Sequence, residues 1–473
     1  MPITPSTGGE LAGWVDGSNM DGWTPLMAGK NGVNISTQSP KGGMNNALQL
    51  ASIAGHLEIV RVLIKNGAAI NVTDEDGDTA LSSAAEYGRT DVVAFLIEKG
   101  ADRDVVSDRG WTPLLRASSN GHTEVVRALL EAGVTVNKQL PDGSGALQLA
   151  AGRGHLTVVE LLLDSGALMN LVDSAGDSPL IVAARHGQTD AVKFLLEKGA
   201  AIDLASRNGW TSLLGASENG HVDVVSLLLA KGANVNKRLP NGSTALHVAA
   251  SNGHLQVVKL LLEFGVPVDV VNGDGDTPLF VAAASGRASV VKLLIERGAS
   301  VVLTNHSGWT AAIKAAELGH RAVVKAVLKS NTAMKVIDMQ LPSGATALNV
   351  ACEHGRFDVV VALVNAGADL ELADSEGYTP LITAAQLGYS DIIQLLVNRG
   401  ADVNVQLPSG GTALLTAVWH RRLAVVRILL DNGADIDLCG DFQNWPPLTA
   451  AYFSGFSDLV QLIYERVPDR LFN

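Results

Sequence analysis

The sequence predicts an all-α repeat solenoid, in which pairs of short helices stack in a row and hairpin-like turns join each pair to the next. Two observations predict this fold. A phrase of similar residues recurs at a spacing of about 33 residues, and the apolar residues of each copy follow the spacing of amphipathic helices. The composition agrees, because aromatic residues make up only 4% of the chain, which suits a core of small repeated layers.

The recurring phrase reads Gly-x-Thr-Pro-Leu, two small residues, Gly-His, Val-Val and Leu-Leu, with substitutions from copy to copy. Its opening position advances by one constant step through Met44, Gly77, Gly110, Gly143, Gly176, Gly209, Gly242, Gly275 and Gly308. The series continues through Gly344, Gly377, Gly411 and Asn444, with a longer step between Gly308 and Gly344. Copies that open with Gly-Asp form every third copy in the middle of the chain, at Gly77, Gly176 and Gly275.

Each copy carries the signals that begin and end two helices. In the copy that opens at Gly77, Thr79 can cap a first helix by accepting a hydrogen bond from a backbone N–H. Gly88 and Gly100 can each end a helix, because glycine adopts the left-handed conformation without strain. Between these glycines an apolar stripe predicts a second helix, and it consists of Val92, Val93, Leu96 and Ile97.

The segments between copies carry turn signals. Leu140-Pro141-Asp142-Gly143 fits a type I turn, with proline at its second position and glycine at its fourth. Other copies place proline at the first helical position, where a missing N–H costs nothing. These prolines are Pro113, Pro179, Pro278 and Pro380. Each copy is therefore expected to fold as turn, helix, loop and helix.

The phrase and its period resemble the ankyrin repeat, and the resemblance covers about nine-tenths of the chain. It implies three regions: an irregular N-terminal segment with a truncated repeat over residues 1–43, twelve ankyrin repeats over residues 44–443, and a partial C-terminal capping repeat over residues 444–473. The first region begins a copy at Gly22-Trp23-Thr24-Pro25-Leu26, but the next copy already opens at Met44, so about a third of a repeat is missing.

The copies differ at positions where the ankyrin phrase is usually constant. The resemblance implies a histidine after Thr-Pro-Leu, and only His247 keeps it. Other copies hold Gln49, Leu115, Gln148, Ile181, Leu214, Phe280 or Leu415 there, so the hydrogen bond of that histidine is expected to be lost in most copies. Gly145 replaces the capping Thr and Ala312 replaces a packing Leu, so these two copies are expected to be weak points.

Composition excludes several classes of function. The net charge of −13 and the pI of about 5.3 leave no basic footprint for nucleic acid. The two cysteines, Cys352 and Cys439, cannot form a disulfide framework. Met1 to Glu10 has neither a basic start nor an apolar run, so no signal peptide is expected there, and no run of 18 apolar residues could span a membrane. We therefore expect an intracellular protein, cytoplasmic or nuclear, that is a monomer.

No catalytic or metal-binding constellation stands out. Six histidines share one loop position after glycine, where the resemblance implies a structural role; they are His56, His122, His155, His221, His254 and His320. Asp74-x-Asp76-x-Asp78 resembles the start of a calcium loop but lacks its glycine and its final acid, so a polar turn is expected. We therefore expect no enzyme, no metal and no cofactor.

Candidate partner-binding residues follow from the resemblance, which implies that partners meet a concave face lined by hairpin tips and first helices. The tip candidates are Trp111, Trp210, Trp309, Tyr378 and Trp445. Candidates at the ends of first helices are Tyr87, Arg185, His186 and Glu218. A basic and aromatic cluster, with Arg421 where glycine is usual, supplies Trp419, His420 and Arg422. The tip tryptophans are either anchors for a partner or residues that pack against the following tip.

The expected function is that of a non-enzymatic scaffold or adaptor that binds a protein or peptide on this concave face. The alternative is a regulatory or substrate-targeting subunit of a larger enzyme assembly whose catalytic part lies on another chain. Fold alone does not name the partner.

Overall fold

The computed structural model describes residues 47–330, 333–439 and 445–466. The expected truncated repeat over residues 1–43 lies outside the described residues. The chain divides into two compact units, residues 1–237 (unit 1) and residues 238–473 (unit 2), and each is described by itself.

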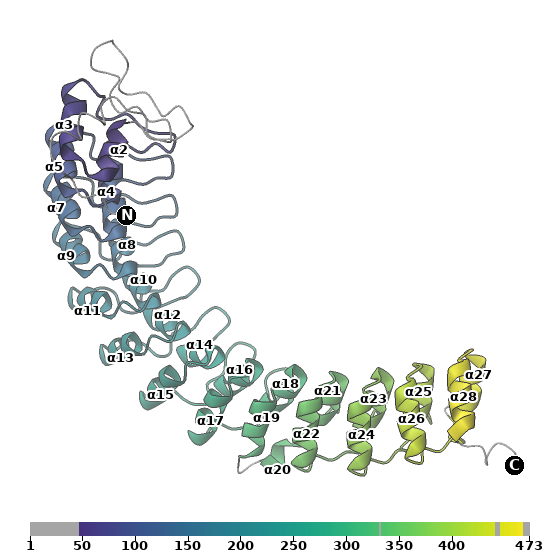
Figure 1. Ribbon diagram of the computed structural model, residues 1–473. Coiled ribbons are helices and arrows are strands. Elements are labelled where there is room, and N and C mark those ends of the chain that lie inside the picture. The colour runs from purple at the N-terminus through teal and green to yellow at the C-terminus, as the bar shows by residue number, and fades with distance from the viewer. Residues whose placement is uncertain (1–46, 331–332, 440–444, 467–473) are drawn as a thin grey trace, which may run out of the picture. The chain divides into compact units, whose positions relative to one another are not determined.

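In unit 1, helices pair along the chain into repeats, and each pair has a first and a second helix (Figure 1). The first helices are α2 (Ala47–Ala54), α4 (Ala80–Glu86), α6 (Pro113–Asn120), α8 (Ala146–Arg153), α10 (Pro179–Arg185) and α12 (Ser212–Glu218). The second helices are α3 (Leu57–Lys65), α5 (Thr90–Glu98), α7 (Thr123–Glu131), α9 (Leu156–Asp164), α11 (Thr189–Glu197) and α13 (Val222–Ala230). First helices pack on first helices of neighbouring repeats, and the turns project beside them.

Unit 2 has the same organisation. Its first helices are α14 (Ala245–Asn252), α16 (Pro278–Ala284), α18 (Ala311–Leu318), α21 (Ala347–Glu353), α23 (Pro380–Leu387), α25 (Ala413–Trp419) and α27 (Pro447–Phe453). Its second helices are α15 (Leu255–Glu263), α17 (Ala288–Glu296), α19 (Arg321–Leu328), α22 (Phe357–Asn365), α24 (Ser390–Asn398), α26 (Leu423–Asp431) and α28 (Ser457–Arg466). The longer step between Gly308 and Gly344 contains an additional turn of helix, α20 (Ala333–Val336).

The predicted all-α repeat fold is confirmed. Across the described ranges the extended structure is limited to isolated antiparallel bridges, such as that between Gln139 and Gly145, which close the hairpin turns. In that turn the Gly143 N–H donates to the Leu140 carbonyl at 2.8 Å, as the type I prediction requires. We call these turns the tips of the repeats.

The predicted helix signals are also confirmed. The Thr79 side chain accepts from the Ser82 N–H at the start of α4, and Gly88 has a φ of +70° just after α4 ends. On α5, Val92, Val93 and Leu96 are at most 1% exposed. These residues form the core that neighbouring repeats share, since one pair of helices cannot bury such a stripe alone.

The shared loop position holds repeats together, as the structural interpretation of its histidines predicts. The His122 Nε2 lies 2.8 Å from the Glu86 carbonyl of the preceding repeat, and His221 lies 2.9 Å from the Arg185 carbonyl in the same way. Where arginine replaces histidine, as at Arg287, its Nε donates to the equivalent carbonyl at 2.9 Å. The position therefore satisfies a carbonyl at the end of the previous first helix.

Most copies lack the histidine hydrogen bond, as expected, but two copies keep an equivalent bond through glutamine. His247 Nε2 lies 3.0 Å from the Asp276 carbonyl of the next tip. Gln148 donates to the equivalent carbonyl of Asp177 at 2.7 Å, and Gln49 donates to that of Asp78. An amide N–H reaches the same acceptor, because glutamine presents a donor at a similar distance from the helix. Copies with Leu, Ile or Phe at this position have no side-chain donor for the bond.

Backbone bonds also join successive tips. The Ser174 N–H donates to the Asp142 carbonyl of the preceding tip at 2.8 Å, and the Gly273 N–H donates to the Asn241 carbonyl at 2.8 Å. The carbonyl acceptors sit directly before glycines with positive φ, Gly143 and Gly242. The tips therefore approach one another closely enough to stack by main-chain contact.

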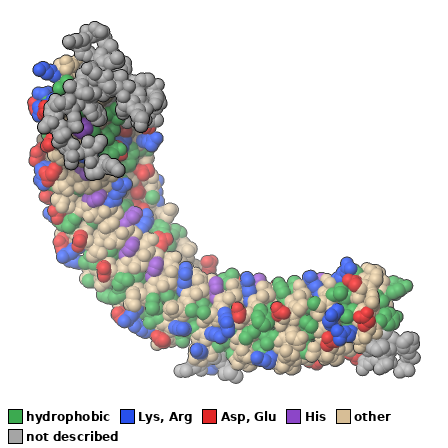
Figure 2. Space-filling view, viewed as in Figure 1, with side chains coloured by type: hydrophobic (Ala, Val, Ile, Leu, Met, Phe, Trp, Pro, Cys, Tyr) green, Lys and Arg blue, Asp and Glu red, His purple; other side chains and the backbone are tan. Residues whose placement is uncertain are grey.

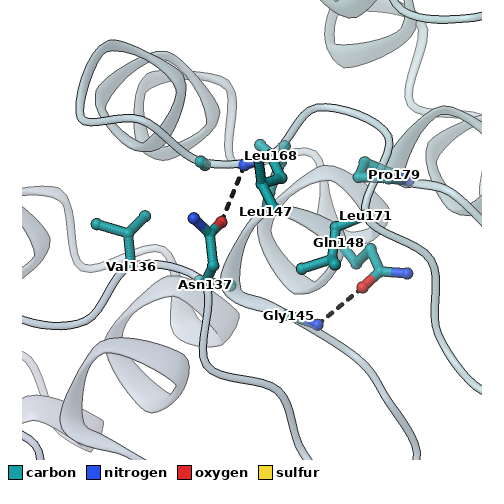
Figure 3. Close-up of a pocket in the computed structure, with 10 residues that line it drawn as sticks. Val136, Asn137, Gly145, Leu147, Gln148, Leu168, Leu171 and Pro179 are labelled. Carbon is teal, nitrogen blue, oxygen red and sulfur yellow. Dashed lines mark hydrogen bonds between the residues drawn. The ribbon is translucent and has the colours of Figure 1, made fainter.

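A small cavity lies where Gly145 stands in place of a capping threonine (Figure 3). It holds about 10 Å³ and is bordered by Leu147, Leu171 and Pro179. The Gly145 N–H donates to Gln148 Oε1 at 2.8 Å, but glycine offers no oxygen in return to the first turn of α8. One half of the usual reciprocal cap is therefore missing.

Gly145→Thr is expected to raise the free energy of unfolding by about 1 kcal/mol, because it restores the cap and restricts the unfolded chain. The backbone at Gly145 can accept a threonine without strain, because its φ is −102° and a Cβ would lie 3.4 Å from its nearest neighbour, Leu171 Cδ2. Urea unfolding followed by circular dichroism measures the change. The reverse substitution in a sister repeat, Thr112→Gly, should cost a similar amount; a loss there without a gain at Gly145 would show that the cavity cannot take the side chain.

Candidate functional site

The tip aromatics are placed by their own backbone. The Trp111 N–H donates to Ser107 Oγ at 3.1 Å, and the Trp210 N–H donates to Ser206 Oγ at the same distance. In unit 2 the Trp309 N–H donates to Asn305 Oδ1 at 3.0 Å. All three rings are half-buried. The hydrogen bonds of the turn thus fix the backbone position from which each indole ring projects, and part of each tryptophan stays exposed to solvent.

Two of these rings already lie beside a cation of their own chain. The Arg116 guanidinium carbon is 5.6 Å from the centre of the Trp111 ring, and Lys314 Nζ is 5.0 Å from that of Trp309. Such contacts are favourable cation–π interactions. Tyr378 is half-buried at its tip in the same way. Both open interpretations, partner anchor and packing residue, remain compatible with this half-buried setting.

The candidates at the ends of first helices differ in their contacts. Tyr87 follows α4 and is 50% exposed. Arg185 is held by Asp177, with its Nη1 2.6 Å from Oδ2 and its Nη2 3.3 Å from Oδ1. His186 Nδ1 lies 2.9 Å from the Val182 carbonyl, and Glu218 is the last residue of α12. Of these four side chains, Tyr87 offers the largest open apolar surface.

Several exposed aromatic side chains lie together in unit 2. The rings of Trp419 and Trp445 stack with their centres 6.3 Å apart, and Trp445 stacks on Phe453 at 4.7 Å. Tyr452 meets Phe453 edge to face at 5.5 Å. We call these four residues the aromatic cluster. The structure brings together two of the predicted residues, Trp419 and Trp445, and adds two that were not predicted.

Three segments position the aromatic cluster. Trp419 is the last residue of α25, Trp445 lies two residues before the start of α27, and Tyr452 and Phe453 end α27. Trp419 is 40% exposed, Tyr452 69% and Phe453 64%, although each already contacts another ring. In Figure 2, hydrophobic side chains lie at the surface at this end of unit 2. The sequence signal for the missed pair was two adjacent aromatics shortly before the loop glycine Gly455.

The basic residues beside Trp419 have structural contacts. Arg421 has a φ of +52°, and within the described ranges every other residue with positive φ is glycine. This left-handed backbone conformation is strained for a residue with a Cβ, at a cost of roughly 1–2 kcal/mol. Its Nη2 lies 3.1 Å from Asp458 Oδ2, and its guanidinium lies 5.5 Å from the Phe456 ring. Arg422 occupies the loop histidine position and donates from Nε to the Gln386 carbonyl at 3.1 Å, while His420 is exposed.

The acidic turn has the polar character expected of it. Asp74 Oδ1 accepts from the Asp76 N–H at 3.1 Å and from the Asp78 N–H at 2.8 Å, so one carboxylate shapes the tip. The residues that the structure describes contain no group of three His, Cys, Asp or Glu side chains arranged to hold a metal ion. Among the helices in those same ranges, none has the length and apolarity needed to cross a membrane.

Comparison with known protein families finds matches along most of the chain, from residue 25 to residue 441. The family described as ankyrin repeats (3 copies) matches in overlapping segments: residues 25–106, 99–173, 147–239, 216–305, 246–339, 303–374, 333–407 and 366–441. No curated protein matches the chain. Among solved structures, the chain is similar to the human ASB11 ankyrin repeat domain. The two are 31% identical over 49% of this chain and 99% of that one, with a TM-score of 0.44. The family matches run almost without interruption through both units, and the chain therefore belongs to the ankyrin repeat family, whose repeats are in general protein–protein interaction modules.

Proposed function

We propose that this chain is a non-enzymatic scaffold or adaptor that binds a protein or peptide on the face formed by its tips and first helices. The observation that carries the proposal is the aromatic cluster of Trp419, Trp445, Tyr452 and Phe453. Four aromatic rings, each in contact with the next, form its surface in a chain that has only 4% aromatic residues.

The chemistry of this cluster suits a protein partner. Large aromatic side chains give much contact area for little loss of rotamer entropy, and they are enriched among the residues that dominate binding energies. Because the rings stack on one another, they are already ordered before a partner arrives, which lowers the entropic cost of binding. Contiguous exposed apolar surface of this kind is typical of interaction sites.

The setting of the cluster supports the same conclusion. Arg421 holds a strained backbone conformation beside it and is anchored to Asp458 and Phe456 of the following repeat. Backbone strain of this kind persists only where the surroundings enforce it, and it is often found at functional sites. A glycine at position 421 would not be strained in this conformation, but the chain has arginine there.

The test is affinity capture from a cell lysate with the full chain and with the double variant Trp419→Ala, Phe453→Ala. Truncating two central aromatic anchors is expected to weaken binding of the captured protein by at least about 30-fold, which corresponds to about 2 kcal/mol. The affinity is then measured by titrating the purified partner. Capture of an enzyme would favour the alternative role as a regulatory or substrate-targeting subunit.

Two further variants make the result specific. Phe264→Ala, Phe357→Ala removes two phenylalanines of the same unit that are 48% and 43% exposed, one directly after α15 and one at the start of α22, and it should leave capture unchanged. Trp111→Ala, Trp210→Ala, Trp309→Ala tests whether the tip tryptophans are anchors. If the cluster variant and the control variant retain the same proteins as the intact chain, the aromatic cluster is not the anchor and the proposal fails.

A further inference from the structure

A second feature of the tip and first-helix face is a polar pocket in unit 1. It has a volume of about 240 Å³ and lies where the tips at Gly77 and Gly110 meet α4 and α6. Six charged residues line it: Asp74, Asp76, Asp78, Glu86, Arg109 and Arg116. Four carboxylates thus face two guanidinium groups, so negative charge is in excess.

The two arginines of the pocket are already engaged. Arg116 Nη2 pairs with Asp78 Oδ2, and its Nη1 lies 2.6 Å from Glu86 Oε2. Arg109 pairs with Asp76 at 3.2 Å on the open rim, where its side chain is 76% exposed. Neither arginine neutralises the second oxygen of Asp78.

Asp78 is the unsatisfied group of the pocket. It is 8% exposed, and its Oδ1 has no hydrogen-bond partner among the described residues. Burial raises the pKa of the Asp78 carboxyl to about 6; Arg116 opposes the rise, and the carboxylates of Asp74, Glu86 and Asp76 add to it. Arg116 Nε is also buried without an acceptor in the described part of the chain. At the wall of the pocket, therefore, one buried acceptor, Asp78 Oδ1, and one buried donor, Arg116 Nε, have no partner among the described residues.

The other repeats that open with Gly-Asp show how this aspartate is otherwise satisfied. In the repeat that opens at Gly176, Arg185 bonds to both oxygens of Asp177. At the position of Arg185 the repeat of Asp78 has Glu86, a residue of opposite charge. In the repeat that opens at Gly275, Asp276 Oδ1 accepts from Asn305 Nδ2 at 2.9 Å. Of these three repeats, only that of Asp78 has a second carboxylate where Arg185 neutralises the aspartate.

We propose that this pocket receives a basic side chain, lysine or arginine, of the bound protein or peptide. The inference rests on the proposed protein-binding function and deepens it. The cation donates to Asp78 Oδ1 between the carboxylates of Glu86 and Asp76, and it supplies the charge that Arg185 supplies in the sister repeat. Tyr87, half-exposed at the pocket, offers its ring to the same cation. A carbonyl of the bound chain can accept from Arg116 Nε.

The test titrates the full chain with a defined probe, acetyl-Ala-Ala-Arg-Ala-Ala-amide, and follows the peptide by ligand-observed NMR. A second peptide carries citrulline, which keeps the shape of arginine without its charge. The intact chain is expected to bind the arginine peptide at least tenfold more tightly than the citrulline peptide. Asp78→Asn should remove this preference, and the matched variant Asp177→Asn should keep it.

Glu86→Arg provides a second variant that remains informative if Asp78→Asn does not fold. It recreates the arrangement of the sister repeat, so it should satisfy Asp78 internally and abolish the preference for the charged peptide. The inference is overturned if the intact chain binds both peptides equally or binds neither, or if Asp78→Asn and Glu86→Arg both keep the preference. The aromatic cluster lies in unit 2 and the pocket in unit 1. A failed capture experiment would therefore contradict the proposed role of the cluster, whereas a failed titration would contradict only the pocket.

Discussion

Gly242→Ala is expected to lower the free energy of unfolding by about 3 kcal/mol, the sum of a left-handed backbone cost and a main-chain clash. Gly242 has a φ of +79°, and a Cβ there would lie 2.5 Å from the Gly273 nitrogen. That nitrogen donates to the Asn241 carbonyl at 2.8 Å, so the tip must move and the bond between successive tips must lengthen.

Gly265→Ala separates the two causes. Gly265 has a similar φ of +84°, but a Cβ there would have no neighbour within 4 Å. It should therefore lose only about 1 kcal/mol, the backbone cost alone. Urea unfolding of both variants measures the difference, and hydrogen exchange of the Gly273 amide reports the tip contact directly. Equal losses in the two variants would contradict a stabilising role for tip stacking.

His247→Ala is the second substitution with a large expected effect, a loss of about 3 kcal/mol from two unsatisfied backbone groups and a cavity. His247 is 2% exposed. Its Nε2 donates to the Asp276 carbonyl at 3.0 Å, and its Nδ1 accepts from the Thr244 N–H at 3.2 Å. Alanine leaves both backbone groups buried without a side-chain partner.

His247→Gln is the matched control, because Gln148 performs both tasks in a sister repeat. It should remain within about 1 kcal/mol of the native chain at pH 7.5. Comparison with this variant also isolates the part of the pH dependence of stability that His247 causes. Burial lowers the pKa of His247 below its usual value of 6.5, so the folded state binds fewer protons than the unfolded state in this range. The contribution of His247 is present above pH 6.5 and declines as the pH falls below it.

The native chain should therefore lose more stability between pH 7.5 and pH 5 than His247→Gln does. Unfolding the two proteins side by side at both pH values measures this, since all other titrating groups are shared. The same loss in both proteins would show that His247 does not titrate differently in the folded and unfolded states.

The fold was predictable because its signals are local and repeated. Thr79, Gly88 and the Leu140–Gly143 turn each follow a rule that involves neighbours within a few residues, and the array applies those rules many times. The positive φ at Arg421 was equally predictable, because the alignment of copies shows the missing glycine. Hydrogen bonds made by Gln49 and Gln148 were not foreseen, since the family phrase names a histidine and the shared requirement is only a donor.

The sites were less predictable because they depend on contacts between repeats. Trp419 was a candidate from its own copy, but its stack on Trp445, which in turn stacks on Phe453, forms only when the next first helix is in place. Predicting the polar pocket would have required contacts between residues that lie still further apart in the sequence. Asp78 and Arg116 are 38 residues apart, and the unsatisfied Oδ1 is visible only once every nearby donor has been placed.

The bonds that cross from one repeat to the next span about one period of the sequence, for example 36 residues from Glu86 to His122 and 33 residues between the Gln139 side chain and Val172. A chain built from such short-range connections can fold while it is still being synthesised. At about 5 to 20 residues per second, each new repeat leaves the ribosome roughly every 2 to 7 seconds. It meets a finished neighbour on which to dock, so a nascent chain exposes little more than one unpaired apolar stripe at any moment.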